Sequence, residues 1–148
     1  MVADGQALGP ALRGRITGSA TVSVGGTVVG LIGATTPLLP SISSPGSVGV
    51  APLNPTDFAA LAAIIQTRVN ALRASGVTRI ILMTHMQQYA IEINELAPRL
   101  DGVDLIIAGG SHSIFADSTD RLRSGDSAAE TYPVWRTSLS GEPVAVVN

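Results

Sequence analysis

Two short apolar runs constrain the fold more than any other feature of the 148-residue sequence. Thr78–Thr84 and Val103–Ala108 carry apolar side chains at consecutive positions, so both faces of each segment are apolar. This pattern is typical of central strands in a parallel sheet, which are covered on both faces. Between the runs lie the 16 residues Met86–Asp101, enough for a crossover helix. Because crossovers have a nearly invariant hand, we expect the two strands to lie side by side or one apart and to point the same way.

Helical spacing marks two segments that would pack on this sheet. Pro55–Ser75 has one apolar stripe, formed at three- and four-residue intervals by Phe58, Leu61, Ala62, Ile65, Val69 and Leu72. Either Asn54 or Thr56 is expected to cap its start. A second stripe predicts a helix over Tyr89–Ala97, stopped by Pro98. The resulting β-α-β-α-β order predicts an α/β fold, with helices packed across the faces of a parallel sheet.

Hairpins are expected at both ends of this order. Ala20–Val24 and Thr27–Leu31 flank Gly25-Gly26, two residues that tolerate the positive φ of a tight turn. Near the end of the chain, Tyr132–Trp135 and Pro143–Val147 predict a late hairpin.

Two connecting segments are assigned from their composition. The stretch from Pro37 to Asn54 is rich in Pro and Gly, and we interpret it as a loop. A loop of that length either forms a functional rim or packs on something absent from this chain. Gln87 and Gln88 are expected to begin the crossover helix.

Composition excludes several classes of function. The net charge of -2 leaves no basic stripe for a nucleic-acid polymer. The absence of Cys removes disulfides, thiolate zinc sites and cysteine nucleophiles, and all nine basic residues are Arg, which removes lysine chemistry. No apolar run approaches the ~20 residues of a membrane span, and Met1–Pro10 lacks the basic start and apolar stretch of a signal peptide. A single globular domain remains, with two His and eleven carboxylates as its titratable groups for chemistry.

The two histidines are placed where chemistry is expected in a parallel sheet. His85 directly follows the first apolar run, and His112 lies four residues after the second, behind Gly109-Gly110. Functional crevices form beyond the carboxyl ends of such strands, so we expect both imidazoles at one edge, within reach of a shared ion. The two glycines permit a tight turn and a close backbone approach to a ligand. The competing interpretation, a hydrogen-bonded structural histidine at a strand end, stays open for each residue taken alone.

The segments around these histidines also resemble a known family. Ile80–Gln88 (IILMTHMQQ) followed by Gly102–His112 (GVDLIIAGGSH) is similar to the later half of the catalytic domain of bacterial 5′-nucleotidase-type metallophosphoesterases, in the calcineurin-like superfamily. Further segments that fit in order are Val29–Pro37, Ile42–Gly46, Thr131–Pro133 and Gly141–Asn148. The resemblance spans roughly residues 19–148.

The resemblance implies a fold, a site and an activity. The fold is an α/β/β/α sandwich with mainly parallel strands and crossover helices, in which residues 1–148 form the C-terminal part of one metallophosphoesterase domain. The site holds two divalent metal ions, with His85 and His112 as ligands, and Zn, Mn, Fe, Mg and Ca are not distinguished. The implied reaction is hydrolysis of a nucleotide or another phosphomonoester by metal-bound hydroxide. Relatives are mostly periplasmic or extracellular.

The sequence departs from the family pattern in two ways. The usual Gly-His-X-His motif has Gly110 in place of its first histidine, and the earlier Asp-X-His and Asn-His motifs do not occur, nor does the nucleoside-binding domain. We therefore expect this chain alone to bind metal weakly, without turnover, and to self-associate through an exposed sheet edge and apolar face. The alternative function is a non-catalytic α/β domain that uses the same scaffold for binding or assembly.

Other candidate groups are weaker. Asp117, Asp120 and Asp126 follow His112 and offer carboxylates, but their polar surroundings favour a solvated loop. Ser111 is disfavoured as a nucleophile because no base other than the two histidines is evident. Thr84 is expected to satisfy backbone groups at the strand end, with a supporting role beside the site as the alternative.

Overall fold

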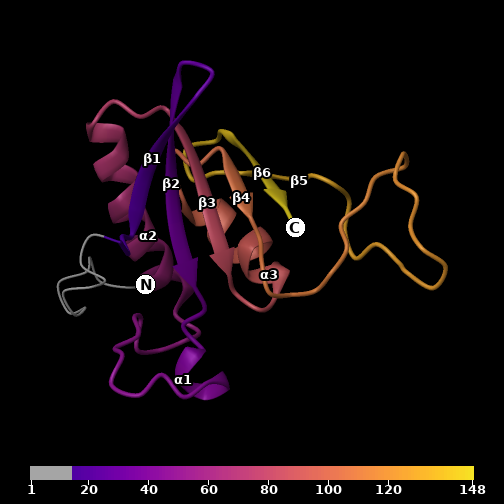
Figure 1. The fold of residues 1–148 in the computed structure, drawn as a ribbon, viewed down its shortest axis with the longest axis horizontal. Coiled ribbons are helices and arrows are strands. Elements are labelled where there is room, and N and C mark those ends of the chain that lie inside the picture. The colour runs from indigo at the N-terminus through magenta and orange to yellow at the C-terminus, as the bar shows by residue number, and fades with distance from the viewer. Residues whose placement is uncertain (1–14) are drawn as a thin grey trace.

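Six strands form one mixed sheet in the computed structural model, which describes residues 15–148 (Figure 1). The strands are β1 (Ser19–Val24), β2 (Thr27–Thr35), β3 (Arg79–His85), β4 (Leu105–Ile107), β5 (Val134–Thr137) and β6 (Pro143–Val147). Their order is β1-β2-β3-β4-β6-β5, with antiparallel pairs β1–β2 and β5–β6 and parallel pairs β2–β3, β3–β4 and β4–β6. The predicted α/β sheet, its two hairpins and its adjacent parallel strands are confirmed. The prediction for Met1–Pro10 lies outside the described residues.

The longest helix, α2 (Phe58–Ala74), matches the predicted apolar stripe. Its cap differs from the prediction: the side chain of Asp57 accepts the N–H of Ala60 at 2.9 Å. Asn54 instead accepts the N–H of Thr56 at 3.1 Å, which forms a local turn before the helix. The segment predicted as loop before α2 also contains one short helix, α1 (Leu39–Ile42).

The crossover helix is less regular than its stripe predicts. It consists of α3 (Tyr89–Ile91), the π-helical η1 (Glu92–Leu96) and the 3-10 turn η2 (Ala97–Arg99). Gln87 and Gln88 do not begin it, because Gln87 has a φ of 72° and Gln88 is extended. Pro98 does not end it, because a proline fits the first turn of a new helical segment, where its missing N–H has no partner to lose.

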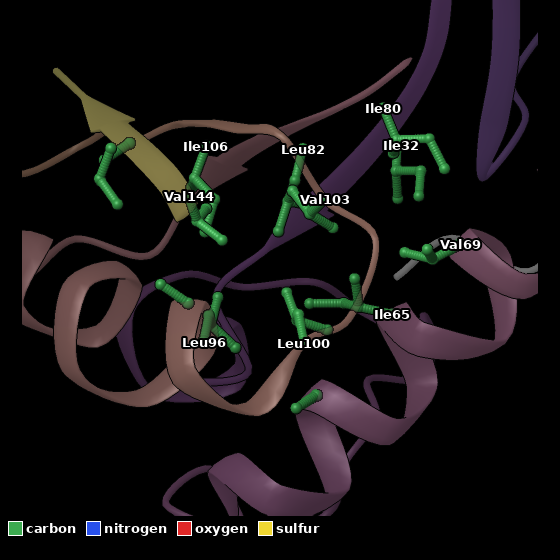
Figure 2. Close-up of a cluster of buried hydrophobic side chains, with 14 of the residues drawn as sticks. Ile32, Ile65, Val69, Ile80, Leu82, Leu96, Leu100, Val103, Ile106 and Val144 are labelled. Atoms are coloured by element: carbon green, nitrogen blue, oxygen red, sulfur yellow. The ribbon is translucent and has the colours of Figure 1, made fainter. Parts of the chain in front are cut away.

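The core lies on one face of the sheet, beneath α2 and the crossover segment. Register places Ile32, Leu82, Ile106, Val146 and Val134 side by side across five strands, and all are buried. Figure 2 shows the strand side chains on one side of this cluster and those of the helical segments on the other. The helical side contributes Ile65, Val69, Leu96 and Leu100, which are at most 1% exposed.

The opposite face of the sheet is the exposed apolar face that the sequence analysis expects. Met83 and Ile107 lie side by side on β3 and β4 and are 42% and 40% exposed, and Trp135 is 60% exposed. Both faces of the two runs are apolar, as predicted, but no described segment covers the second face. Of the four layers of the expected α/β/β/α sandwich, the described residues form one sheet and one helical layer.

A long arm leaves the sheet between β4 and β5. Residues 108–133 form no helix or strand and project well away from the sheet (Figure 1). The base of the arm is closed by a bridge between Phe115 and Glu130, and the Phe115 ring meets Tyr89 edge-on with centroids 5.3 Å apart. Within residues 15–148, no helix has the length and hydropathy to cross a membrane.

Candidate functional site

His85 ends β3 and lies at the carboxyl edge of the sheet. Side chains alternate along this strand: Leu82 and Thr84 are buried on the helix side, whereas Met83 and His85 are exposed on the open face. The backbone here is tied to the end of β2, because the N–H of Thr36 donates to the His85 carbonyl over 3.0 Å. The imidazole is therefore open to solvent at the end of a central strand, as the sequence predicts.

His112 lies in the turn after β4 and is also exposed. Its φ of 56° is in the left-handed region, where histidine is more frequent than most residues. The side-chain amide of Asn148 donates to the Ser111 hydroxyl at 2.8 Å and to the Ser113 carbonyl at 3.1 Å. One side chain therefore holds the residues on both sides of His112, and the Ser111 hydroxyl has a structural partner.

Two glycines bring the ends of β3 and β4 into close contact. A Cβ at Gly109 would lie 2.6 Å from the carbonyl oxygen of Thr84. A Cβ at Gly110 would lie 2.9 Å from both Cδ2 and Nε2 of His85, and Gly110 has a φ of 90°. Both positions therefore require glycine in this conformation. The first histidine position of the Gly-His-X-His pattern is closed here by the His85 ring itself.

Two open hollows adjoin these residues. One, of about 320 Å³, lies on the open face and is lined by Ile16–Gly18, Gly33–Thr35 and Met83–His85. The other, of about 310 Å³, lies between the start of α3 and the His112 turn and is lined by Gln87–Ala90, Ser111 and Ser113. Both are at the small end of the range for ligand sites, which suits a compact polar ligand.

A buried carboxylate lies directly behind the strand end. Glu92, the first residue of η1, is 0% exposed, and its Oε1 accepts the Thr84 hydroxyl at 2.7 Å. The same hydroxyl lies 3.2 Å from the Ile107 carbonyl at the end of β4. Among residues 15–148, the second carboxylate oxygen, Oε2, has no hydrogen-bond partner. Burying a carboxylate with one oxygen unpaired costs free energy, so its place here requires a reason.

Burial raises the pKa of Glu92. The Thr84 hydrogen bond, the N–H groups of Glu92 and Met86 and the charge of His85 all act in the opposite direction, but burial prevails.

Sequence reasoning missed Glu92, although a signal was present. The helical stripe of Tyr89, Ile93 and Leu96 includes position 92 at the same spacing, so an acid stands among residues that face the core. An acid on the buried stripe of a helix, eight residues after the strand-end Thr84, indicates a carboxylate with a structural or functional partner. Asn148 carried no comparable signal, because its contacts depend on the turn around His112.

The described residues do not form a complete metal site. Within residues 15–148, no group of three or more His, Asp or Glu side chains is placed to bind one ion. The carboxylates of Asp117, Asp120 and Asp126 are exposed on the arm, as predicted. Asp117 is engaged locally: hydrogen bonds from the hydroxyl and N–H of Thr119 hold its pKa below its usual value. Two imidazoles are suitable metal donors, but alone they do not complete the coordination of a divalent ion.

Known proteins with a similar sequence are 5′-nucleotidases. The rat 5′-nucleotidase is 30% identical over 142 residues, which is 95% of this chain and 23% of the rat protein. The mouse 5′-nucleotidase is 31% identical over 138 residues, 93% of this chain and 22% of that protein. The chain thus spans under a quarter of the length of these relatives. No protein-family model matches it.

Solved structures agree with the sequence comparison. A 5′-nucleotidase precursor from Thermus thermophilus superposes with a TM-score of 0.75 at 32% identity, over 94% of this chain and 25% of that one. The Haemophilus influenzae NAD nucleotidase superposes with a TM-score of 0.72 at 26% identity, over 93% of this chain and 25% of that one. The single sheet with its helical layer is therefore an arrangement that recurs within larger enzymes.

Proposed function

We propose that the chain is a 5′-nucleotidase-type metallophosphoesterase region and that it builds part of the active site of a phosphoester hydrolase. The observation that carries the proposal is the pair of exposed histidines at the ends of β3 and β4, in a fold shared over 94% of the chain with the Thermus 5′-nucleotidase. The substrate class is a nucleotide or another phosphomonoester, since the similar proteins carry nucleotidase names. A periplasmic or extracellular location is part of this proposal.

In this proposal His85 and His112 are ligands of divalent metal ions. Imidazole suits Zn, Mn and Fe alike, so the ligands alone do not select the metal. A pair of bound ions would activate water and hold phosphoryl oxygens. The remaining ligands come from polypeptide outside residues 15–148, because the described residues lack a third donor near the two histidines. This chain is accordingly the C-terminal part of one metallophosphoesterase domain.

The chain's own residues orient the two imidazoles. Gly110 gives the His85 ring a flat backbone surface to lie on, and the hydrogen bonds of Asn148 hold the turn that carries His112. The hollow beside His85 is open toward the uncovered face of the sheet, where a phosphate ester would enter. The His85 ring and the turn that carries His112 are thus placed before any ligand arrives, which lowers the entropy cost of binding.

The decisive experiment is replacement of His85 in the protein that contains this region. Metal-dependent release of phosphate from nucleoside monophosphates is measured for wild type, His85→Ala and His112→Ala. Asp117→Asn is the matched control, because Asp117 is an exposed potential ligand on the arm. We expect loss of hydrolysis in both histidine variants and none in the control. Full activity in His85→Ala would overturn the assignment.

One observation favours a second candidate function. The two histidines have no third donor among the described residues, which fits a non-catalytic domain that keeps the scaffold for binding or assembly. Isothermal titration of the 148-residue chain with Mn²⁺ or Zn²⁺ separates the two. Weak binding that disappears in His85→Ala supports the hydrolase region, and binding unaffected by both histidine replacements supports the second candidate.

A further inference from the structure

The least explained group in the molecule is the carboxylate of Glu92. It is 0% exposed, as are the neighbouring core residues Ile93 and Leu96 to within 1%, and one of its oxygens has no partner in the part of the chain that the structure describes. A leucine at this position would be expected if packing were the only requirement, since an unpaired buried carboxylate destabilises the fold. The Glu92 carboxylate therefore has a role that compensates for the free-energy cost of its burial.

The hydrogen bond to Thr84 indicates that role. The Thr84 hydroxyl is the junction of three segments: it belongs to β3, it donates to Glu92 Oε1 at 2.7 Å, and it lies 3.2 Å from the Ile107 carbonyl of β4. The β3–β4 pairing ends at Met83 and Ile107, so the Thr84 hydroxyl continues the connection one residue past the last paired position. Glu92 holds this hydroxyl from the helical side.

The next residue is His85, and its placement depends on that junction. The Thr84 carbonyl packs on Gly109 and the His85 ring packs on Gly110, so a shift of Thr84 would move both contacts. Beyond His85 the chain enters the left-handed conformation of Gln87 before α3 begins. The backbone of His85 is also held by β2, through the N–H of Thr36, and the Thr84 junction adds a restraint from β4 and η1 next to the imidazole.

The helical geometry supports a role at the site. Glu92 begins the π-helical segment of the crossover, where the backbone widens by one residue per turn. Such segments are frequent at functional sites. Here the side chain of Glu92 is the one that holds Thr84.

We propose that Glu92 is a positioning residue of the site, which fixes Thr84 and through it the orientation of the His85 imidazole against Gly110. The proposal rests on the function proposed above and adds a residue to it. Glu92 acts through Thr84 and does not itself contact the ion or the substrate. Replacement of residues that orient metal-binding histidines typically lowers metal affinity about 10- to 100-fold.

The test compares Thr84→Val, Thr84→Ser and Glu92→Leu with Glu95→Gln as the matched control. Thr84→Val keeps the shape of the side chain and removes the hydroxyl, and Thr84→Ser restores it. Glu95 lies in the same π-helical segment but pairs with Arg99 at 2.7 Å on the outside. Two readouts are used: long-range ¹H–¹⁵N spectra of the imidazoles without metal, and isothermal titration with Zn²⁺. The chain has only two histidines, so their signals are readily assigned.

We expect Thr84→Val and Glu92→Leu to shift the His85 signals and leave those of His112 in place. Zinc affinity should fall about 10- to 100-fold in both variants and recover in Thr84→Ser. Thermal melts by circular dichroism check that each variant folds. If Glu92→Leu does not fold, the test is made with Thr84→Val alone. Folded variants with unchanged His85 signals and affinity would overturn the inference. If His85→Ala leaves zinc binding and hydrolysis intact, the proposed function fails, while the imidazole spectra still decide whether Glu92 positions His85.

Discussion

The imidazole of His85 lies directly on the backbone of Gly110, at a distance that leaves no room for a Cβ. A methyl group at Gly110 would be 2.9 Å from two ring atoms, and the residue has a φ of 90°. The strand end that carries one candidate ligand is thus in contact with the loop that carries the other.

Gly110→Ala should weaken metal binding through the ring of His85. The variant combines strain from the positive φ with a collision against the imidazole, so the ring must move. Gly125→Ala is the control, because Gly125 has a φ of 93° and nothing within 4 Å of its Cβ position. Both variants should lose about 1–3 kcal/mol of stability from strain. Only Gly110→Ala should lower the affinity for Zn²⁺ in isothermal titration, and equal affinities in the two variants would contradict this.

The elements that the sequence predicts well are those whose signals are local. The hairpin at Gly25-Gly26, the stripe of α2 and the paired apolar runs are each specified by neighbouring residues, and each is present. The positions of His85 and His112 at strand ends follow from the same runs. The surroundings of the two histidines cannot be predicted in this way, because the contact with Gly110 and the hydrogen bond of Asn148 join residues far apart in sequence.

One failure has a physical cause that a hydrophobic pattern does not contain. The stripe predicts one continuous crossover helix, but Glu92 begins a π-helical segment in its middle, and Pro98 lies in the first turn of a further 3-10 segment. The apolar runs alone are typical of strands covered on both faces, because hydropathy reports that a face is apolar and not what covers it. The second face is exposed at Met83 because no described segment crosses it.

Stability should fall with rising pH because of Glu92. Its pKa is raised in the folded protein above the ordinary value of 4.5, so the folded state binds this proton more tightly than the unfolded state. The contribution is fully present below pH 4.5 and is lost as pH rises through the raised pKa. Glu92→Gln removes the titration. Urea unfolding between pH 4.5 and about pH 8 should therefore show the variant gaining stability relative to wild type as pH rises.

The control for this pH profile is Glu95→Gln, from the same segment but paired with Arg99 on the surface. Its stability difference from wild type should not follow the Glu92 profile, since an exposed ion pair contributes little. A pH-independent difference between wild type and Glu92→Gln would show that Glu92 titrates alike in the folded and unfolded states.

Gly30→Ala should destabilise the packing of α2 on the sheet. A Cβ at Gly30 would lie 2.8 Å from Leu72 Cδ1 and 3.2 Å from Val77 Cγ1, within the covered face. Overpacking of this kind costs about 1–3 kcal/mol. Gly33→Ala is the control on the same strand, because its Cβ would point to the uncovered face and meets nothing within 4 Å. Urea unfolding should show a loss for Gly30→Ala and a change within about 0.5 kcal/mol for Gly33→Ala.

The uncovered face of the sheet should make the isolated chain self-associate. Register aligns Leu31, Ile81, Leu105, Ala145 and Trp135 across the sheet, and Met83 and Ile107 lie beside each other in the next row. An apolar surface of this kind marks an interaction site, and a second copy of the same face is the partner available in a pure sample. Sedimentation velocity should therefore show a sedimentation coefficient that increases with protein concentration.

The double variant Met83→Gln/Ile107→Gln tests which surface is responsible. Both residues are about two-fifths exposed, at 42% and 40%, so the replacements remove apolar area without opening the core. Leu53→Gln is the control, because Leu53 is 96% exposed in the loop before α2 and contributes nothing to the sheet face. The double variant should shift toward monomer and the control should behave as wild type. A wild-type chain that stays monomeric at every concentration, with one sharp thermal transition, would mean that the uncovered face does not bind a second copy. A control that dissociates as readily as the double variant would place the contact elsewhere on the surface.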